Sequence, residues 1–133
     1  MDSIFNLSNM RTIWVIDDDM VTLFSTSYKI HQYRPNYNVV SFHSIENAIA
    51  AYERCLSNNE QVPNVLLLDL QFPTLGGWYF LKKLEEYNIS DNEIDIYILS
   101  AFSKPESTLR ALKHPLVKGY FYKPVTLAEL NVL

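Results

Sequence analysis

Short apolar runs alternate along the chain with segments in which apolar residues recur at helical spacing. The runs are either rich in β-branched and aromatic residues or continuous in Val, Ile and Leu, which is typical of buried strands. We predict strands over residues 12–16, 37–42, 65–68, 94–99 and 117–122. The helical pattern covers residues 20–32, 45–56, 78–87 and 103–113, and a short last helix opens at Thr126. Strands that alternate with helices indicate a parallel sheet with helices on both faces and right-handed crossovers.

Apolar spacing and capping residues define the predicted helices further. The first helix groups four side chains on one face, namely Val21, Phe24, Tyr28 and His31. Ser44 is a candidate N-cap for the second helix. Thr126, followed three residues later by Glu129, matches the capping-box pattern that opens a helix.

Length, composition and charge narrow the class of protein. The 133 residues are 48% hydrophobic and 20% charged, which suits one globular domain; we assign residues 1–11 to a polar lead-in and residues 12–133 to the domain. The net charge is −4 and the basic residues are scattered, so direct nucleic-acid binding is not expected. The single Cys55 excludes an internal disulfide framework. Neither a signal peptide nor a membrane-spanning stretch is visible, so we expect a cytoplasmic location and no membrane partner.

Polar side chains follow four of the predicted strands, at the point where each strand ends. The carboxyl ends of parallel strands share one edge of the sheet, where ligands bind. The residues at these ends are Asp17 and Asp18 after the first strand, Asp69 after the third, Ser100 after the fourth and Lys123 after the fifth. An isolated Asp at such a place is as often a turn cap as a functional group, but the set as a whole predicts a site.

Three carboxylates at one edge repel one another by about 4 kcal/mol per close pair at an effective dielectric constant near 20. A hard divalent cation offsets this repulsion, and Mg²⁺ is commonly held by one or two carboxylates. With the metal assigned to Asp17 and Asp18, Asp69 remains as a nucleophile that can form an aspartyl-phosphate. Lys123 would then spread the charge of the transferred group, and Ser100 would donate a hydrogen bond to it.

Over residues 12–133 the chain resembles the receiver domain of two-component response regulators. The resemblance lies in the acidic run at residues 17–19, the segment 66–77 around Asp69, the Leu-Ser-Ala at 99–101 and the Tyr-Phe-Tyr-Lys-Pro at 120–124. It implies an α/β fold of the flavodoxin-like type, with a doubly wound, five-stranded parallel sheet in the order 2-1-3-4-5. It also implies a signalling domain rather than an enzyme, with self-catalysed phosphorylation and dephosphorylation only.

The resemblance assigns roles to single residues. Asp69 would accept a phosphoryl group from a sensor histidine kinase or a phosphotransfer protein. Mg²⁺ would be bound by Asp17, Asp18, Asp69 and the backbone carbonyl of Gln71. Lys123 would contact the phosphoryl group, and the Lys123–Pro124 peptide bond would be cis.

The resemblance also implies a route by which the signal leaves the site. Ser100 would move toward the phosphoryl oxygen, and the aromatic Tyr120 would turn inward in response. A downstream protein would then bind the face made by the fourth helix, the fifth strand and the fifth helix.

Two other interpretations fit part of the sequence. Residues 17–21 resemble the first motif of haloacid-dehalogenase-like phosphatases, with Asp17 as nucleophile and Asp19 as general acid. That interpretation leaves Asp69 unexplained, and the chain lacks both a later acidic pair and a cap insertion. A degenerate receiver that acts only as an interaction module is disfavoured by the intact set of acids, Ser100 and Lys123.

Overall fold

Five strands form one parallel sheet in the order β2-β1-β3-β4-β5, as expected from the sequence. The computed structural model describes residues 10–72, 76–87, 93–101 and 105–133. The strands are β1 (Thr12–Ile16), β2 (Asn38–Phe42), β3 (Val65–Asp69), β4 (Asp95–Ser100) and β5 (Val117–Tyr122). Because β1 lies between β2 and β3, the ends of β1 and β3 are neighbours at the carboxyl edge.

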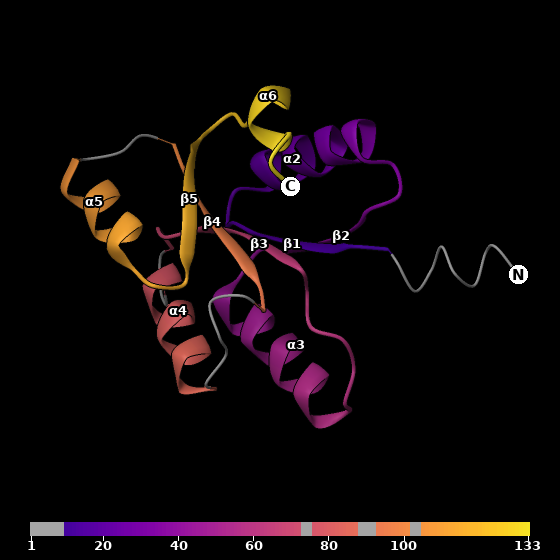
Figure 1. The fold of residues 1–133 in the computed structure, drawn as a ribbon, viewed down its shortest axis with the longest axis vertical. Helices are drawn as coiled ribbons and strands as arrows, with labels where there is room; N and C mark the ends of the chain where they lie inside the picture. The colour runs from indigo at the N-terminus through magenta and orange to yellow at the C-terminus, as the bar shows by residue number, and fades with distance from the viewer. Residues whose placement is uncertain (1–9, 73–75, 88–92, 102–104) are drawn as a thin grey trace, which may run out of the picture.

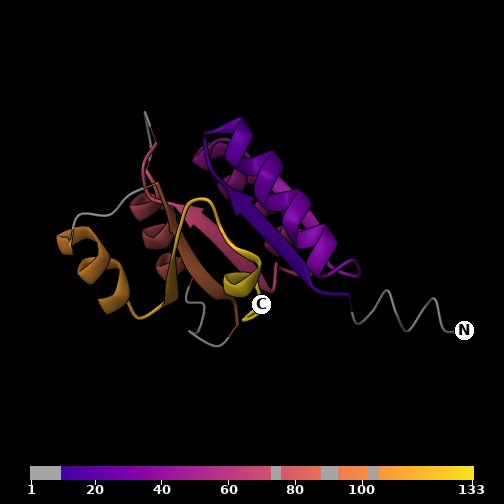
Figure 2. The same ribbon diagram turned by 90° about the horizontal axis from the view of Figure 1, so that it is seen from above.

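Helices cover both faces of this sheet (Figures 1 and 2). Helices α2 and α6 lie on one face, and α3, α4 and α5 lie on the other. The helices are α2 (Met20–Tyr33), α3 (Ile45–Ser57), α4 (Gly77–Glu86), α5 (Pro105–Lys113) and α6 (Leu127–Leu130). In the described part of the chain, none of them is long and apolar enough to cross a membrane.

The pleat of the strands divides the core into two clusters, because successive side chains point to opposite faces of a sheet. Ile13 and Val15 of β1 pack in the cluster under α2 and α6, together with Leu67 of β3. Trp14 and Ile16 pack in the other cluster, among side chains from α3, α4 and α5. The three central strands are therefore buried on both faces, which explains their continuous apolar sequences.

The apolar face of α2 that the spacing singled out lies toward solvent. Val21 is 74% exposed, Phe24 76% and Tyr28 56%, and His31 is also exposed. The helix instead packs through a second apolar face, made of Leu23, Thr26 and Ile30. Two apolar faces on one helix look alike in sequence, and only the contact with the sheet decides which is buried.

The predicted helix caps are confirmed where the structure describes them. The Ser44 side chain accepts a hydrogen bond from the backbone N–H of Asn47, and α3 begins after it. Thr126 and Glu129 form a reciprocal capping box at α6. The predicted start of the fourth helix at Ser103 lies outside the described residues, and α5 is described from Pro105 onward.

Candidate functional site

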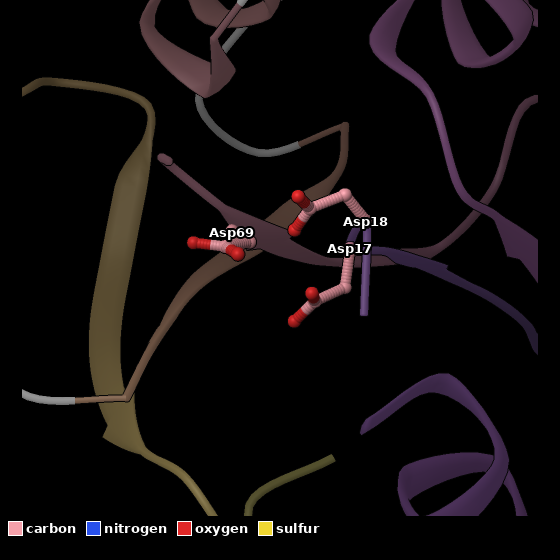
Figure 3. A group of neighbouring side chains, drawn as sticks. All are labelled: Asp17, Asp18 and Asp69. Atoms are coloured by element: carbon pink, nitrogen blue, oxygen red, sulfur yellow. The ribbon is translucent and has the colours of Figure 1, made fainter. Parts of the chain in front are cut away.

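The three predicted metal-binding acids meet at the carboxyl edge of the sheet (Figure 3). Asp17 and Asp18 follow the last residue of β1, and Asp69 is the last residue of β3. Each carboxylate offers one oxygen atom, and these oxygens lie within 4.8 Å of one another. Asp17 and Asp69 are buried, whereas Asp18 is exposed, so the cluster opens to solvent on one side only.

Backbone amides hold the two buried carboxylates in place. Oδ1 of Asp17 accepts a hydrogen bond from the N–H of Asp19 at 2.9 Å. Oδ1 of Asp69 accepts one from the N–H of Gln71 at 3.0 Å. Each bond spans two residues and closes an Asx-type turn, so the same turn that ends the strand also fixes the direction of its terminal carboxylate.

Lys123 connects the two buried acids across the edge of the sheet. Its Nζ lies 2.5 Å from Oδ2 of Asp17 and donates a hydrogen bond to Oδ2 of Asp69 at 3.1 Å. The lysine follows β5, and its backbone N–H donates to the carbonyl of Ser100 at the end of β4, at 2.7 Å. One cation thus balances part of the negative charge of the cluster.

The site raises the pKa values of both Asp17 and Lys123, for different reasons. Burial raises the pKa of Asp17 from 3.8 to about 6, and the Asp69 charge adds to this, although Lys123 and the Asp19 amide oppose it. Burial alone would lower the pKa of Lys123, but the carboxylates of Asp17 and Asp69 outweigh burial and raise it. Lys123 therefore stays charged at neutral pH, whereas ionisation of Asp17 lowers the free energy of unfolding.

The residues of the cluster fit a hard divalent cation. All three donors are carboxylate oxygens, which is the chemistry that Mg²⁺ prefers. Oδ2 of Asp17 is fully buried and accepts no hydrogen bond of normal geometry, although it lies beside the Lys123 ammonium. An acceptor in that state has capacity for a metal ion or its water. The fourth predicted ligand, the backbone carbonyl of Gln71, stays a prediction.

The remaining predicted site residues lie on the neighbouring strands. Ser100 is buried at the end of β4, next to β3. Tyr120, in β5, is half-buried against the cluster under α3, α4 and α5, and its ring lies 5.3 Å from that of Tyr122. The Lys123–Pro124 bond is cis, as the resemblance implied. Whether Ser100 and Tyr120 move as a pair stays a prediction.

Asp19 has a structural role, which argues against the phosphatase interpretation. Its side chain caps α2 by accepting from the N–H of Val21 at 3.0 Å and from the hydroxyl of Thr22 at 2.8 Å. The Thr22 hydroxyl and the Val21 amide lower the pKa of Asp19. A general acid needs the opposite shift, toward the working pH.

The sequence analysis missed the role of Gly77 in positioning the site. A Cβ atom on Gly77 would lie 2.4 Å from the carbonyl oxygen of Asp69 and 2.9 Å from Cα of Leu70. The N–H of Gly77 donates to the carbonyl of Leu70 at 3.2 Å, so α4 starts directly against the end of β3. The available signal was the pair of consecutive glycines directly before the predicted helix at residues 78–87.

A doubly wound parallel sheet in the order 2-1-3-4-5, with an acidic cluster at the switch between β1 and β3, defines a flavodoxin-like domain of the receiver type. The family profile described as the response regulator receiver domain matches residues 13–133. The chain belongs to this family. No curated protein sequence matches the chain significantly.

Solved structures of response regulators are similar to the chain over nearly its full length. A two-component response regulator from Cytophaga hutchinsonii has a TM-score of 0.84 at 22% identity, with 92% of each chain covered. One from Legionella pneumophila has a TM-score of 0.76 at 23% identity, covering 92% of this chain and 93% of the other. The DrrB receiver domain, in a BeF3-activated state, has a TM-score of 0.70 at 25% identity, covering 92% and 96%.

Proposed function

We propose that the chain accepts a phosphoryl group on Asp69 from a phosphohistidine of a sensor histidine kinase or a phosphotransfer protein. The observation that carries the proposal is the convergence of Asp17, Asp18 and Asp69 within 4.8 Å, with Lys123 bound to two of them. Family membership supports the same function. Of the two acids that contact Lys123, Asp69 ends β3, which lies next to β4 and its terminal Ser100.

In the proposed reaction, one carboxylate oxygen of Asp69 attacks the phosphorus atom of the donor. The new P–O bond gives an acyl phosphate, and the P–N bond to the donor imidazole breaks. Its electron pair stays on the imidazole nitrogen, which takes up a proton from solvent. Lys123 remains charged and lies next to Asp69, so it stabilises the negative charge on the equatorial oxygens in the transition state.

Asp17, Asp18 and Asp69, with the backbone carbonyl of Gln71, would hold Mg²⁺ in this proposal. The metal would neutralise the acids and the phosphoryl oxygens, which lets two anionic groups approach each other. The buried Oδ2 of Asp17 supports this assignment, since it faces the cluster and has no hydrogen bond of normal geometry.

The direct test is incubation with acetyl phosphate and Mg²⁺, followed by intact-mass measurement. We expect a gain of one phosphoryl group in the native chain and none in Asp69→Ala. Chelation of Mg²⁺ should abolish the gain, and Asp95→Ala provides a control at an acid outside the cluster, which pairs with Arg11 and Lys118. Phosphorylation of Asp69→Ala to the native extent, or no gain under any Mg²⁺ condition, would contradict the proposal.

In this proposal the exposed apolar face of α2 is the docking surface for the protein that donates the phosphoryl group. It begins at Met20, Val21 and Phe24, directly after the acidic run that carries Asp17 and Asp18. The rings of Phe24 and Tyr28 stack with centroids 6.5 Å apart, so the face is preformed. Exposed apolar patches of this kind mark protein–protein contacts.

Replacing Phe24 by Ser should slow transfer from a protein donor about tenfold, since truncating a side chain that anchors an interface costs more than about 1 kcal/mol. Labelling by acetyl phosphate should stay unchanged, because Phe24 is 76% exposed and is not a member of the acidic cluster. The measurement is the initial rate of phosphotransfer with each donor. Equal slowing with both donors would show that the substitution acts on the site and not on docking.

The proposed output face carries its own exposed apolar residues. They are Leu109 and Leu112 on α5, Tyr122 on β5 and Leu127 on α6. In this proposal Ser100 and Tyr120 relay phosphorylation to that face, where a downstream protein binds. Leu112→Ser is therefore a matched control for Phe24→Ser, and it should leave transfer from the protein donor unchanged. If Leu112→Ser slows transfer instead, the two faces are assigned the wrong way round.

A further inference from the structure

A second surface feature lies away from the acidic cluster, in a groove between α4 and α5. The groove has a volume of about 530 Å³, within the range of ligand-binding clefts. Its lining includes Trp78, Tyr79 and Lys82 of α4, Arg110 and Lys113 of α5, and Pro115. The two walls thus combine aromatic and proline side chains with three cations.

A contact between two side chains connects the two walls. Nε2 of His114, just after α5, lies 2.5 Å from Oε1 of Glu85 on α4. The other ring nitrogen, Nδ1, accepts a hydrogen bond from the N–H of Leu116 at 3.2 Å. Among the described residues that line the groove, Glu85 is the one acid, and it is already engaged by this histidine. The groove therefore keeps its shape without neutralising its own cations.

The cations of the groove have no anionic partner among the described residues. The guanidinium carbon of Arg110 lies 4.0 Å from the centre of the Trp78 ring, in a cation–π contact. Lys82 and Lys113 make neither an ion pair nor a hydrogen bond with any residue that the structure describes. The chain as a whole carries a net charge of −4, so this groove is a local positive region on a negative molecule.

We propose that the groove between α4 and α5 binds an acidic segment of a partner protein. Carboxylates of the segment would pair with Lys82, Arg110 and Lys113, and an apolar side chain would pack on Tyr79 and Pro115. Charge complementarity of this kind steers a partner and fixes its register. The proposal does not depend on phosphorylation of Asp69, because none of these residues belongs to the acidic cluster.

The arrangement of the cations favours an extended acidic chain over a nucleotide. Arg110 already covers one face of the Trp78 indole, which is the surface on which a base would stack. Lys82 and Lys113 are exposed and stand on opposite walls, so they match carboxylates spaced along a chain. A compact phosphate would instead need donors that converge on one point.

The test is titration with a short synthetic peptide of alternating Glu and Leu, followed by intrinsic fluorescence at low salt. Trp78 lines the groove and should respond, whereas Trp14 is only 5% exposed in the core and should not. We expect the double substitution Lys82→Gln and Lys113→Gln to weaken binding about fivefold, as the loss of two exposed ion pairs predicts. Arg54→Gln, which removes an exposed charge on α3, should leave binding unchanged.

Two control peptides and the dependence of binding on salt complete the test. A peptide with Lys in place of Glu should not bind, and a peptide with Ala in place of Leu should bind more weakly. High salt should weaken binding of the acidic peptide, because the pairs are exposed. Equal binding to the double variant and the native chain would overturn the proposal, as would a failure to bind at millimolar peptide. Saturation of the groove by ATP at lower concentration than the peptide would overturn it in favour of a nucleotide site.

Discussion

Replacing Lys123 by Met is expected to lower the free energy of unfolding of the Mg²⁺-free protein by about 3 kcal/mol at neutral pH. The lysine ammonium is the cation that separates two acids, at 2.5 Å from Asp17 and 3.1 Å from Asp69. The three side chains are 13%, 0% and 8% exposed, so water screens the pair poorly. Without the lysine, two buried carboxylates repel each other with no counter-charge. Urea unfolding in the presence of a chelator measures the loss.

The dependence of this loss on pH follows from Asp17. Its pKa is 3.8 in the unfolded chain and, because of burial, about 6 in the folded protein. Because the pKa is higher in the folded state, the contribution of Asp17 to the free energy of unfolding is greatest below pH 4 and is lost as the pH rises through 6. Lys123→Met raises that pKa further, so the destabilisation should be small near pH 5 and full near pH 8. An equal loss at both pH values would show that lost packing, and not charge, is responsible.

Mg²⁺ and a second lysine supply the controls. Mg²⁺ should restore most of the stability that Lys123→Met removes, since it can neutralise the same carboxylates. Lys118→Met, in the strand that precedes Lys123, removes a partly exposed pair with Asp95 at 3.1 Å and should cost less than about 1 kcal/mol. If the two variants are equally destabilised, the buried position of Lys123 has no special effect.

Gly77→Ala is expected to lower the free energy of unfolding by about 3 kcal/mol, the upper end of the cost of overpacking. The added methyl group would lie 2.4 Å from the carbonyl oxygen of Asp69 and 2.9 Å from Cα of Leu70. Both neighbours are backbone atoms, so a rotamer change cannot relieve the overlap. Either α4 moves away from the sheet or the end of β3 shifts, and a shift of β3 displaces the Asp69 carboxylate.

Two measurements separate these outcomes. Thermal unfolding reports the loss of stability, and the rate of labelling by acetyl phosphate reports the displacement of Asp69. Gly76→Ala is the matched control, because its Cβ would lie 3.0 Å from the carbonyl oxygen of Leu70 and its backbone at φ −89° suits alanine. We expect it to cost less than half as much. A Gly77→Ala variant as stable as the native chain would contradict the close approach of α4 to β3.

The order of elements and the members of the acidic cluster could be predicted from sequence because both depend on local signals. An apolar run such as residues 65–68, ending in an acid, gives both a buried strand and the place of Asp69. Parallel topology then brings Asp17 and Asp18 to the same edge. No property of the fold beyond strand order is needed for that step.

Features that depend on how the helices pack against the sheet and against one another could not be predicted. The face of α2 with Val21 and Phe24 was taken as a single apolar face, whereas the buried one contains Leu23 and Ile30. The groove between α4 and α5 was also missed, because the sequence analysis assigned no role to Trp78. Its partner Arg110 lies 32 positions later in the sequence. Contacts between elements so far apart leave no periodic pattern.

The alternation of side chains along the strands also divides the predicted site residues between the two faces of the sheet. Asp69 follows Val65 and Leu67 on the side of the sheet that packs under α2 and α6, and Asp17 continues the same side from β1. Ser100 and Tyr120 stand at positions of the opposite parity, on the side that packs under α3, α4 and α5. The predicted phosphoryl acceptor and the two predicted switch residues therefore lie on opposite faces of the sheet.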